Sequence, residues 1–196
     1  VPGRKIEVEE GGQKLTIFVP DSFKPADKLR VTIHFHGAPW HAIQEHVDRE
    51  TTDPLIVFSP GEGSRIYQEA MKDPARLDRW FGLVLNEIGR PQAKVTELDL
   101  TSFSAGYGAI REIAQSPRHF ALLRRVVLAD SLYAGLEPGE KRTPLAANID
   151  PWIPLAQAAI EGRKQFAITV SQVKTPTYAN SEECAKEIVR RVGGQA

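Results

Sequence analysis

The residues best suited to nucleophilic chemistry form the segment 102–106, Ser-Phe-Ser-Ala-Gly, near the middle of the chain. Apolar residues of a predicted strand precede it from Val95, and apolar residues at helical spacing follow it from Ile110. A serine on a sharp turn between a strand and a helix has its hydroxyl held clear of the sheet, where it can act as a nucleophile. The pattern therefore indicates Ser104 as a candidate nucleophile.

The same turn could stabilise the negative charge that forms when a serine attacks an acyl group. The backbone amide of Ala105 opens the predicted helix and points to the place where such an oxyanion would form. Small residues two positions before and after Ser104 let the backbone bend tightly, although Ser102 stands where the G-x-S-x-G pattern has its first glycine. The alternative is a purely structural turn, because small-residue turns that contain serine are common.

A nucleophilic serine needs a base, usually a histidine that a carboxylate orients. Asp130 fits the carboxylate, because it ends the buried-type strand 125–130 that follows the candidate nucleophile; its alternative role is to cap a turn. No histidine follows His119, which precedes that strand and so belongs to the wrong end of the sheet. His34 and His36 belong to the carboxyl end of the sheet, where a base would be needed. His34 alternates within its strand, as a packed core residue does, and His36 is expected to shape the loop that follows the strand. A base role for either is the less favoured interpretation, and the sequence identifies no base.

The elements that must position these residues alternate between strands and helices from residue 30 onward. Beyond an N-terminal antiparallel hairpin of 5–9 and 14–19, strands are expected at 30–35, 54–59, 95–100, 125–130 and 166–171. This alternation predicts an α/β protein with a mostly parallel, doubly wound sheet of about seven strands and helices on both faces. Ligands of such sheets bind beyond the carboxyl ends of the strands, where Ser104 and Asp130 are expected. Residues 60–71, which include Tyr67, are expected to form a loop.

The strand at 30–35 ends in His36-Gly37-Ala38, and this arrangement together with the serine turn resembles the α/β-hydrolase superfamily, in particular its small esterase-like members. The resemblance covers most of the chain, because the order of strands and helices agrees as well. It implies an α/β-hydrolase-like fold with a nucleophile elbow, and cleavage of an ester or related acyl bond through an acyl-enzyme intermediate. It also implies that Gly37 or Ala38 supplies a second oxyanion-hole amide beside that of Ala105.

The sequence departs from the family pattern after its last strand. The family sheet usually has eight strands and carries its histidine beyond the last one, whereas seven strands are predicted here. We therefore expect a single α/β-hydrolase-like domain over residues 1–196 that is incomplete at its carboxyl end. The alternatives are a hydrolase-fold pseudoenzyme or ligand-binding module without the base, and a flavodoxin-like ligand-binding domain, for which Gly61-Glu62-Gly63 is thin support.

Aromatic residues at strand ends are candidates for the wall of a substrate pocket. Trp40, Tyr107 and Tyr133 could line an acyl or aryl pocket together with His36, although aromatic residues at such places are as often packed within loops. His46 is expected to be a solvated residue of a short helix.

The balance of charged residues and the single cysteine limit the kinds of partner and cofactor that the protein is expected to bind. The 25 basic residues balance the 25 acidic ones and no Lys/Arg run stands out, so neither nucleic acid nor an anionic membrane is expected as a partner. A small-molecule ester or acyl substrate is expected instead, and no apolar run is long enough to span a membrane. The single cysteine, Cys184, excludes an internal disulfide, and no ligand set has metal spacing, so no metal and no cofactor are expected. Because the sequence begins with Val1, either a cleaved signal peptide, with a secreted or periplasmic location, or a shortened sequence explains its start.

Overall fold

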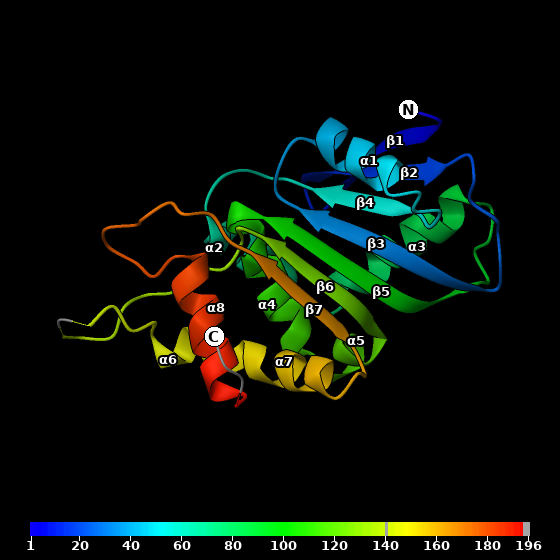
Figure 1. Cartoon of the computed structure of the whole chain (residues 1–196). Coiled ribbons are helices and arrows are strands. Elements are labelled where there is room, and N and C mark those ends of the chain that lie inside the picture. Colours follow the sequence, from blue (N-terminus) through cyan, green and yellow to red (C-terminus); the bar gives the residue numbers. More distant parts are fainter. Residues whose placement is uncertain (140, 194–196) are drawn as a thin grey trace.

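Within residues 1–139 and 141–193, which a computed structural model of the chain describes, seven strands form one mixed sheet (Figure 1). The strands are β1 (Gly3–Glu10), β2 (Gln13–Pro20), β3 (Lys28–Phe35), β4 (Leu55–Phe58), β5 (Lys94–Phe103), β6 (Leu123–Ala129) and β7 (Gln165–Thr169). Their order across the sheet is β1-β2-β4-β3-β5-β6-β7. The predicted fold class, a mostly parallel sheet that begins with an antiparallel hairpin, is confirmed.

The order of the strands places a topological switch point between β3 and β5. From β3 the chain runs outward to β4 on one side, and it then crosses back to β5 on the other side. Phe35 at the end of β3 is in register with Ser102 near the end of β5, so the two loops that follow these strands are neighbours. A crevice at such a switch point is the usual ligand site of an open α/β sheet.

Eight α-helices and two short 3₁₀ turns connect the strands in the described residues. They are α1 (Pro39–Asp48), α2 (Ser64–Met71), α3 (Arg76–Glu87), η1 (Ser104–Gly106), α4 (Tyr107–Gln115), α5 (Pro117–Leu122), α6 (Ala146–Ile149), η2 (Asp150–Trp152), α7 (Ile153–Ile160) and α8 (Ser181–Arg191). Figure 1 shows α1 on the opposite side of the sheet from α4 and α7. The buried residues Ala42 and Ile43 of α1 pack on β2 and β4, whereas α2, α3, α4, α7 and α8 contribute to the main core on the other face.

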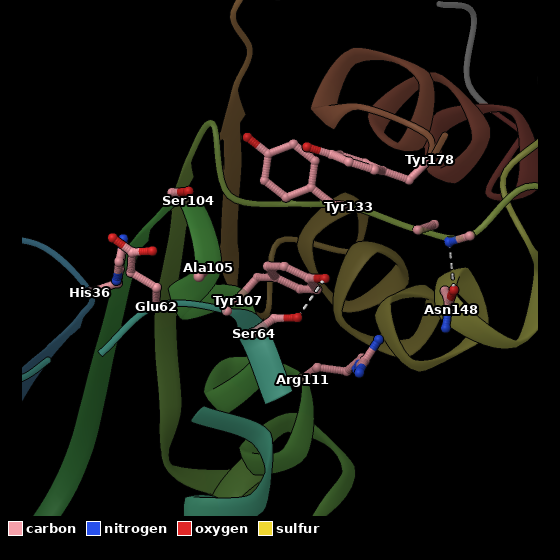
Figure 2. Close-up of a pocket in the computed structure, with 13 residues that line it drawn as sticks. His36, Glu62, Ser64, Ser104, Ala105, Tyr107, Arg111, Tyr133, Asn148 and Tyr178 are labelled. Carbon is pink, nitrogen blue, oxygen red and sulfur yellow. Dashed lines mark hydrogen bonds between the residues drawn. The ribbon is translucent and has the colours of Figure 1, made fainter. Parts of the chain in front are cut away.

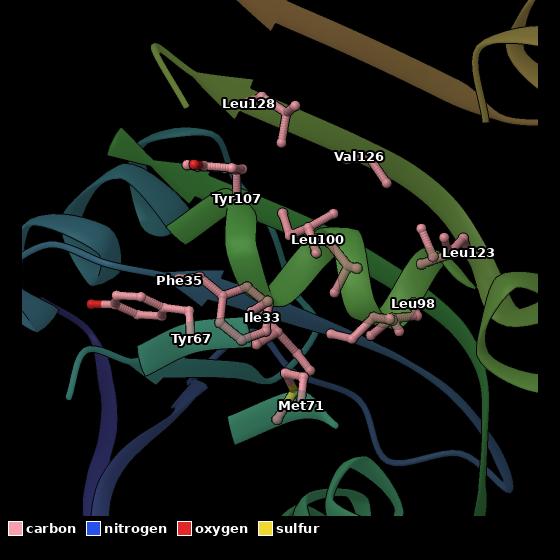
Figure 3. Packing of buried hydrophobic residues seen from close by; sticks show 14 of the residues in the cluster. Ile33, Phe35, Tyr67, Met71, Leu98, Leu100, Tyr107, Leu123, Val126 and Leu128 are labelled. Atoms are coloured by element: carbon pink, nitrogen blue, oxygen red, sulfur yellow. The ribbon is translucent and has the colours of Figure 1, made fainter. Parts of the chain in front are cut away.

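The main core fixes the strands that carry the switch point (Figure 3). Ile33 of β3 and Leu98 and Leu100 of β5 are completely buried, and they pack with Tyr67 of α2 in one hydrophobic cluster. Burial of each such aliphatic side chain stabilises the fold by about 1.5–3 kcal/mol. The ends of β3 and β5 are therefore held firmly with respect to each other.

The prediction of a loop over residues 60–71 was wrong, because α2 occupies most of this segment. Tyr67, Ala70 and Met71 face the core at helical spacing, and Tyr67 is completely buried. The polar residues between these positions, together with the short length of the helix, conceal the period in the sequence.

His46 is also not the solvated residue that was expected. Its side chain is buried, lies edge-on to Phe18 with ring centroids 6.5 Å apart, and places Nε2 2.8 Å from the carbonyl oxygen of Asp53. The acceptor comes from the segment that follows α1, so the local sequence of the helix gives no sign of it. Burial of the ring lowers the pKa of His46.

Candidate active site

The turn after β5 holds Ser104 in an uncommon backbone conformation. Ser104 has a φ angle of +45°, in the left-handed region that residues with a side chain seldom adopt. Its side chain lines a cleft, and no described residue forms a hydrogen bond with its hydroxyl. A strained conformation of this kind costs on the order of 1 kcal/mol or more and persists only where the surroundings enforce it.

A close approach between the turn and β3 enforces that conformation. A Cβ atom on Gly106 would lie 2.2 Å from the carbonyl oxygen of Phe35, which no other residue type could tolerate without a shift of the backbone. Two residues later, Gly108 allows a second close approach, because a Cβ atom there would lie 2.2 Å from the carbonyl oxygen of Ser64 in α2. The glycine at the end of segment 102–106 is thus required by packing, as the motif predicted.

Two buried hydroxyl groups, one from β5 and one from the turn after β6, support the same turn. Ser131 Oγ donates to the carbonyl oxygen of Ser104 at 2.8 Å, and Ser102 Oγ lies 2.7 Å from Ser131 Oγ. Because Ser131 has a single hydroxyl proton, Ser102 must donate to Ser131. The serine that replaces the first glycine of the motif therefore supports the elbow. Sequence reasoning missed Ser131, whose sole signal is its place next to Asp130 at the end of the adjacent strand.

The loop after β3 turns toward this elbow through two residues of positive φ, His36 at 69° and Gly37 at 115°. His34 Nε2 donates to the carbonyl oxygen of His36 at 2.8 Å, and Thr101 Oγ1, 2.8 Å away, donates to His34 Nδ1. Burial lowers the pKa of His34 to about 4, so the ring is neutral near pH 7 and keeps this tautomer. His34 thus fixes the carbonyl group on which the course of the loop depends.

The amides that were predicted to form an oxyanion hole have different surroundings. Ala105 lines the cleft and is the second residue of η1, where an amide has no acceptor within the turn. The Gly37 amide donates to Ser59 Oγ at 3.2 Å, and neither Gly37 nor Ala38 is among the described residues that line the cleft. The oxyanion role of Gly37, Ala38 and Ala105 stays a prediction.

His36 lines the cleft at the same end as Ser104 (Figure 2). Its Nδ1 lies 2.7 Å from the hydroxyl of Tyr67, which in turn donates to the carbonyl oxygen of Gly61 at 2.7 Å. Burial raises the pKa of Tyr67, so its hydroxyl keeps its proton. These bonds place a proton on Nδ1 of His36, and its Nε2 has no hydrogen bond to a described residue. The ring also stacks on Phe103, with centroids 6.0 Å apart and an interplanar angle of 14°.

Asp130 follows β6 and also has positive φ, 42°. One carboxylate oxygen accepts the backbone amide of Ser171 at 3.2 Å, and the other accepts the hydroxyl of Ser171 at 2.7 Å. Partial burial favours a higher pKa, but the hydrogen bonds from Ser171 outweigh it and lower the pKa of Asp130. Asp130 therefore joins the ends of β6 and β7, and among the described residues it contacts no histidine. Its role as the catalytic acid stays a prediction.

The cleft has a volume of about 720 Å³ and lies at the carboxyl ends of the strands (Figure 2). Of the residues predicted from the sequence, those in its lining are His36, Ser104, Ala105, Tyr107 and Tyr133. Trp40 is not in the lining, and its side chain is 70% exposed. Tyr107, Tyr133 and Tyr178 form a run of edge-to-face contacts along the wall, with centroid separations of 5.9 and 5.6 Å.

Several polar residues of the cleft were missed by sequence reasoning, namely Ser64, Arg111 and Asn148, whereas Glu62 was considered only as part of Gly61-Glu62-Gly63. Arg111 could have been found, since it follows Tyr107 by four residues and so shares its face of α4. Asn148 and Tyr178 give no such signal, because they reach the cleft from segments far away in the sequence.

Within residues 1–139 and 141–193 there is no group of three or more His, Cys, Asp or Glu side chains that could hold a metal ion. Burial raises the pKa of the Cys184 thiol to about 12, so this side chain is protonated near pH 7. In the same residues, every helix is too short or too polar to cross a membrane.

No protein-family model matches the sequence, and comparison with curated protein sequences gives no significant match. Among solved structures, poly(aspartic acid) hydrolase-1 from Sphingomonas sp. KT-1 superposes with a TM-score of 0.56 at 14% identity, over 99% of this chain and 88% of that one. The fluorophosphonate-binding serine hydrolase F of Staphylococcus aureus gives a TM-score of 0.54 at 14% identity, over 100% of this chain and 89% of that one. With the strand order and the left-handed turn after β5, these likenesses show that the chain has the α/β-hydrolase fold.

Proposed function

We propose that the chain is a serine hydrolase that cleaves an ester or related acyl bond through an acyl-enzyme intermediate. One observation carries the proposal: the hydroxyl of Ser104 lies in the cleft on a left-handed elbow and is free of hydrogen bonds to the described residues. Two structures of the same fold bear the names of hydrolases, which supports the reaction class and leaves the substrate open.

In the proposed reaction, Ser104 Oγ attacks the carbonyl carbon of the substrate while a base accepts its proton. The amide of Ala105 and an amide from the loop 36–38 would stabilise the oxyanion of the tetrahedral intermediate. Collapse of this intermediate breaks the bond to the leaving group, which takes up the proton from the base. Water then attacks the acyl-enzyme, releases the carboxylic acid and restores the proton to Ser104.

Asp130 is the carboxylate proposed to orient a base histidine, and among the described residues it contacts no histidine. His36 is the histidine in the lining of the cleft among the described residues, and it is a separate candidate for the base: Tyr67, not Asp130, holds its Nδ1, and its Nε2 has no hydrogen bond to a described residue. Labelling of the His36→Gln variant by a fluorophosphonate tests it directly, with His41→Gln, an exposed histidine, as the matched control. A loss of labelling in His36→Gln alone would identify it as the base, and unchanged labelling would exclude it.

The decisive experiment for the reaction class is labelling of the folded protein with a serine-directed fluorophosphonate, combined with hydrolysis of p-nitrophenyl butyrate. We expect Ser104→Ala to abolish both signals, because the nucleophile is removed. Ser22→Ala, in an exposed turn, should retain both signals. Equal labelling of wild type and Ser104→Ala would remove Ser104 from the mechanism.

A second candidate function, a ligand-binding module without catalysis, has its own supporting observation. Both carboxylate oxygens of Asp130 are engaged by Ser171, and among the described residues no histidine is bonded to Ser104. Under this alternative the folded wild type binds an acyl compound without turnover. Absence of labelling and of ester hydrolysis in the wild type would favour it.

A further inference from the structure

We infer that the cleft selects acyl compounds that carry a second, anionic group, and that Arg111 binds this carboxylate at the end of the cleft away from Ser104. The inference rests on the proposed function and names its substrate class. Three observations support it: Arg111 has no carboxylate partner among the described residues, neutral groups hold its side chain in place, and the negative charge of the cleft lies at the other end.

Arg111 stands apart from almost all other arginines of the protein. Among the described residues, every arginine except Arg90 and Arg111 has a carboxylate oxygen within 4.0 Å. Arg90 is exposed in the turn between α3 and β5, where a lone cation is solvated by water. Arg111 instead is half-buried and lines the cleft, and its charge has no carboxylate partner within residues 1–139 and 141–193.

The guanidinium group of Arg111 is held in place by neutral contacts. Its Nη2 donates to Gln68 Oε1 at 2.8 Å, and Gln68 Nε2 donates to Glu112 Oε1 at 2.7 Å, which fixes the orientation of the Gln68 amide. The Cζ atom of Arg111 lies 5.7 Å from the centroid of the Tyr107 ring. These contacts use one hydrogen of Nη2 and leave Nε, Nη1 and the second hydrogen of Nη2 without an acceptor among the described residues, so one two-donor edge of the guanidinium group remains for a carboxylate in a bidentate manner.

Asn148 adds a donor at the same end of the cleft. Its Oδ1 accepts the amide of Gly135 at 2.9 Å, so its Nδ2 is the atom without a hydrogen bond among the described residues. Figure 2 shows Arg111 and Asn148 on one side of Tyr107, and Ser104 on the other. A carboxylate between them would receive charge-assisted hydrogen bonds from Arg111 and a neutral one from Asn148.

The length and polarity of the cleft determine where the anionic group must lie. Seven residues separate Ser104 from Arg111 along η1 and α4, which corresponds to about 10 Å between their backbones, and helical side chains lean back toward the N-terminus. Glu62 lies beside His36 at the opposite end, where its negative charge disfavours an anion (Figure 2). A monoester of a short dicarboxylic acid therefore matches the cleft, with its ester at Ser104 and its free carboxylate at Arg111.

Two substrates of equal chain length test this inference, mono-p-nitrophenyl glutarate and the neutral p-nitrophenyl pentanoate. We expect the wild type to show a kcat/KM about 10- to 100-fold higher for the glutarate, as charge-assisted hydrogen bonds of this kind imply. Arg111→Gln should reduce this ratio to near one, Arg111→Lys should retain part of it, and Arg90→Gln should leave it unchanged. A wild-type ratio of one, or a ratio that survives in Arg111→Gln, would overturn the inference.

The outcomes separate this inference from the proposed function. If the wild type hydrolyses both esters equally well, the anion site is wrong and the proposed function stands. If it hydrolyses neither ester, the proposed function fails, and calorimetric binding of free glutarate tests the anion site alone. Binding that Arg111→Gln weakens about tenfold would support the site, and the absence of glutarate binding to the wild type would refute it.

Discussion

The carboxyl ends of β5 and β6 have similar backbones, but their side chains have different surroundings. Ser104 and Asp130 both have positive φ angles, 45° and 42°, at the ends of neighbouring parallel strands. The hydroxyl of Ser104 faces the cleft and is free of hydrogen bonds to the described residues, whereas Asp130 has both carboxylate oxygens bonded to Ser171. A positive φ angle thus marks a sharp turn at both strand ends. The neighbouring hydrogen-bond donors decide whether the side chain of the residue in that turn is available for chemistry.

The two strand ends are also connected. Ser131, which directly follows Asp130, donates to the carbonyl oxygen of Ser104 and accepts from Ser102. The turn after β6 therefore supports the turn after β5, in addition to the close approach of Gly106 to β3. Variants at Gly106, Ser131 and Ser102 separate these supports.

We expect Gly106→Ala to lower the free energy of unfolding by about 3 kcal/mol or more, because the new Cβ would lie 2.2 Å from a backbone oxygen that cannot move freely. Gly82→Ala in α3 is the matched control. No atom lies within 4 Å of its added Cβ, and the change should stabilise the helix by about 0.5–1 kcal/mol. Urea denaturation of both variants measures the difference. Similar effects of the two changes would show that the elbow does not depend on this close approach.

His34, near the end of β3, should make the free energy of unfolding depend on pH. Its pKa is about 4 in the folded protein and 6.5 ordinarily, so between these values the unfolded chain binds the proton and the folded protein does not. Stability should therefore fall as the pH is lowered from 6.5 to 4, by up to about 3 kcal/mol, and this contribution should change little below pH 4. Denaturation of wild type and His34→Gln at pH 7 and pH 4.5 measures it. His41→Gln serves as control, and an unchanged pH slope in His34→Gln would contradict the assignment.

Ser131→Ala should destabilise the protein by about 2 kcal/mol, because it leaves both the Ser104 carbonyl and the Ser102 hydroxyl without their buried partner. Ser102→Ala removes a single donor to Ser131 and should cost about 1 kcal/mol. Under the proposed function, the rate of fluorophosphonate labelling should fall more in Ser131→Ala than in Ser102→Ala. Equal losses in both variants would mean that the bond to the Ser104 carbonyl does not support the elbow.

The smallest effect on stability is expected at the end of β6. Asp130→Asn should lower the free energy of unfolding by about 1 kcal/mol near pH 7, because the two hydrogen bonds from Ser171 lose their charged acceptor. The loss is small because these groups are partly exposed to solvent. Because these bonds lower the pKa of Asp130 below its ordinary 3.8, the wild type should lose this stability only as the pH falls below that value. Ser171→Ala should give a similar stability loss. If Asp130 is the catalytic acid, Asp130→Asn should slow labelling much more than Ser171→Ala does.

Much of the architecture could be predicted from local patterns. Alternating strands and helices predicted the seven-stranded sheet, and the confirmed fold follows from them. The turn at Ser104 was recognisable because a strand, small residues and a helix follow one another without interruption. The helix α2 was missed, since its buried positions Tyr67, Ala70 and Met71 are few and separated by polar residues.

Strand and helix periods are local properties of the chain, so the amino-acid pattern was sufficient to locate the strand ends and the side chains that stand there. Which of these side chains are hydrogen-bonded and which are free depends on the packing of the strands against one another. The bonds of Asp130 to Ser171, of Ser131 to Ser104 and of Gly135 to Asn148 join residues that have no local relation in sequence. Parallel strands bring their carboxyl ends together from distant segments, so the partners of a side chain there are set by strand order and register.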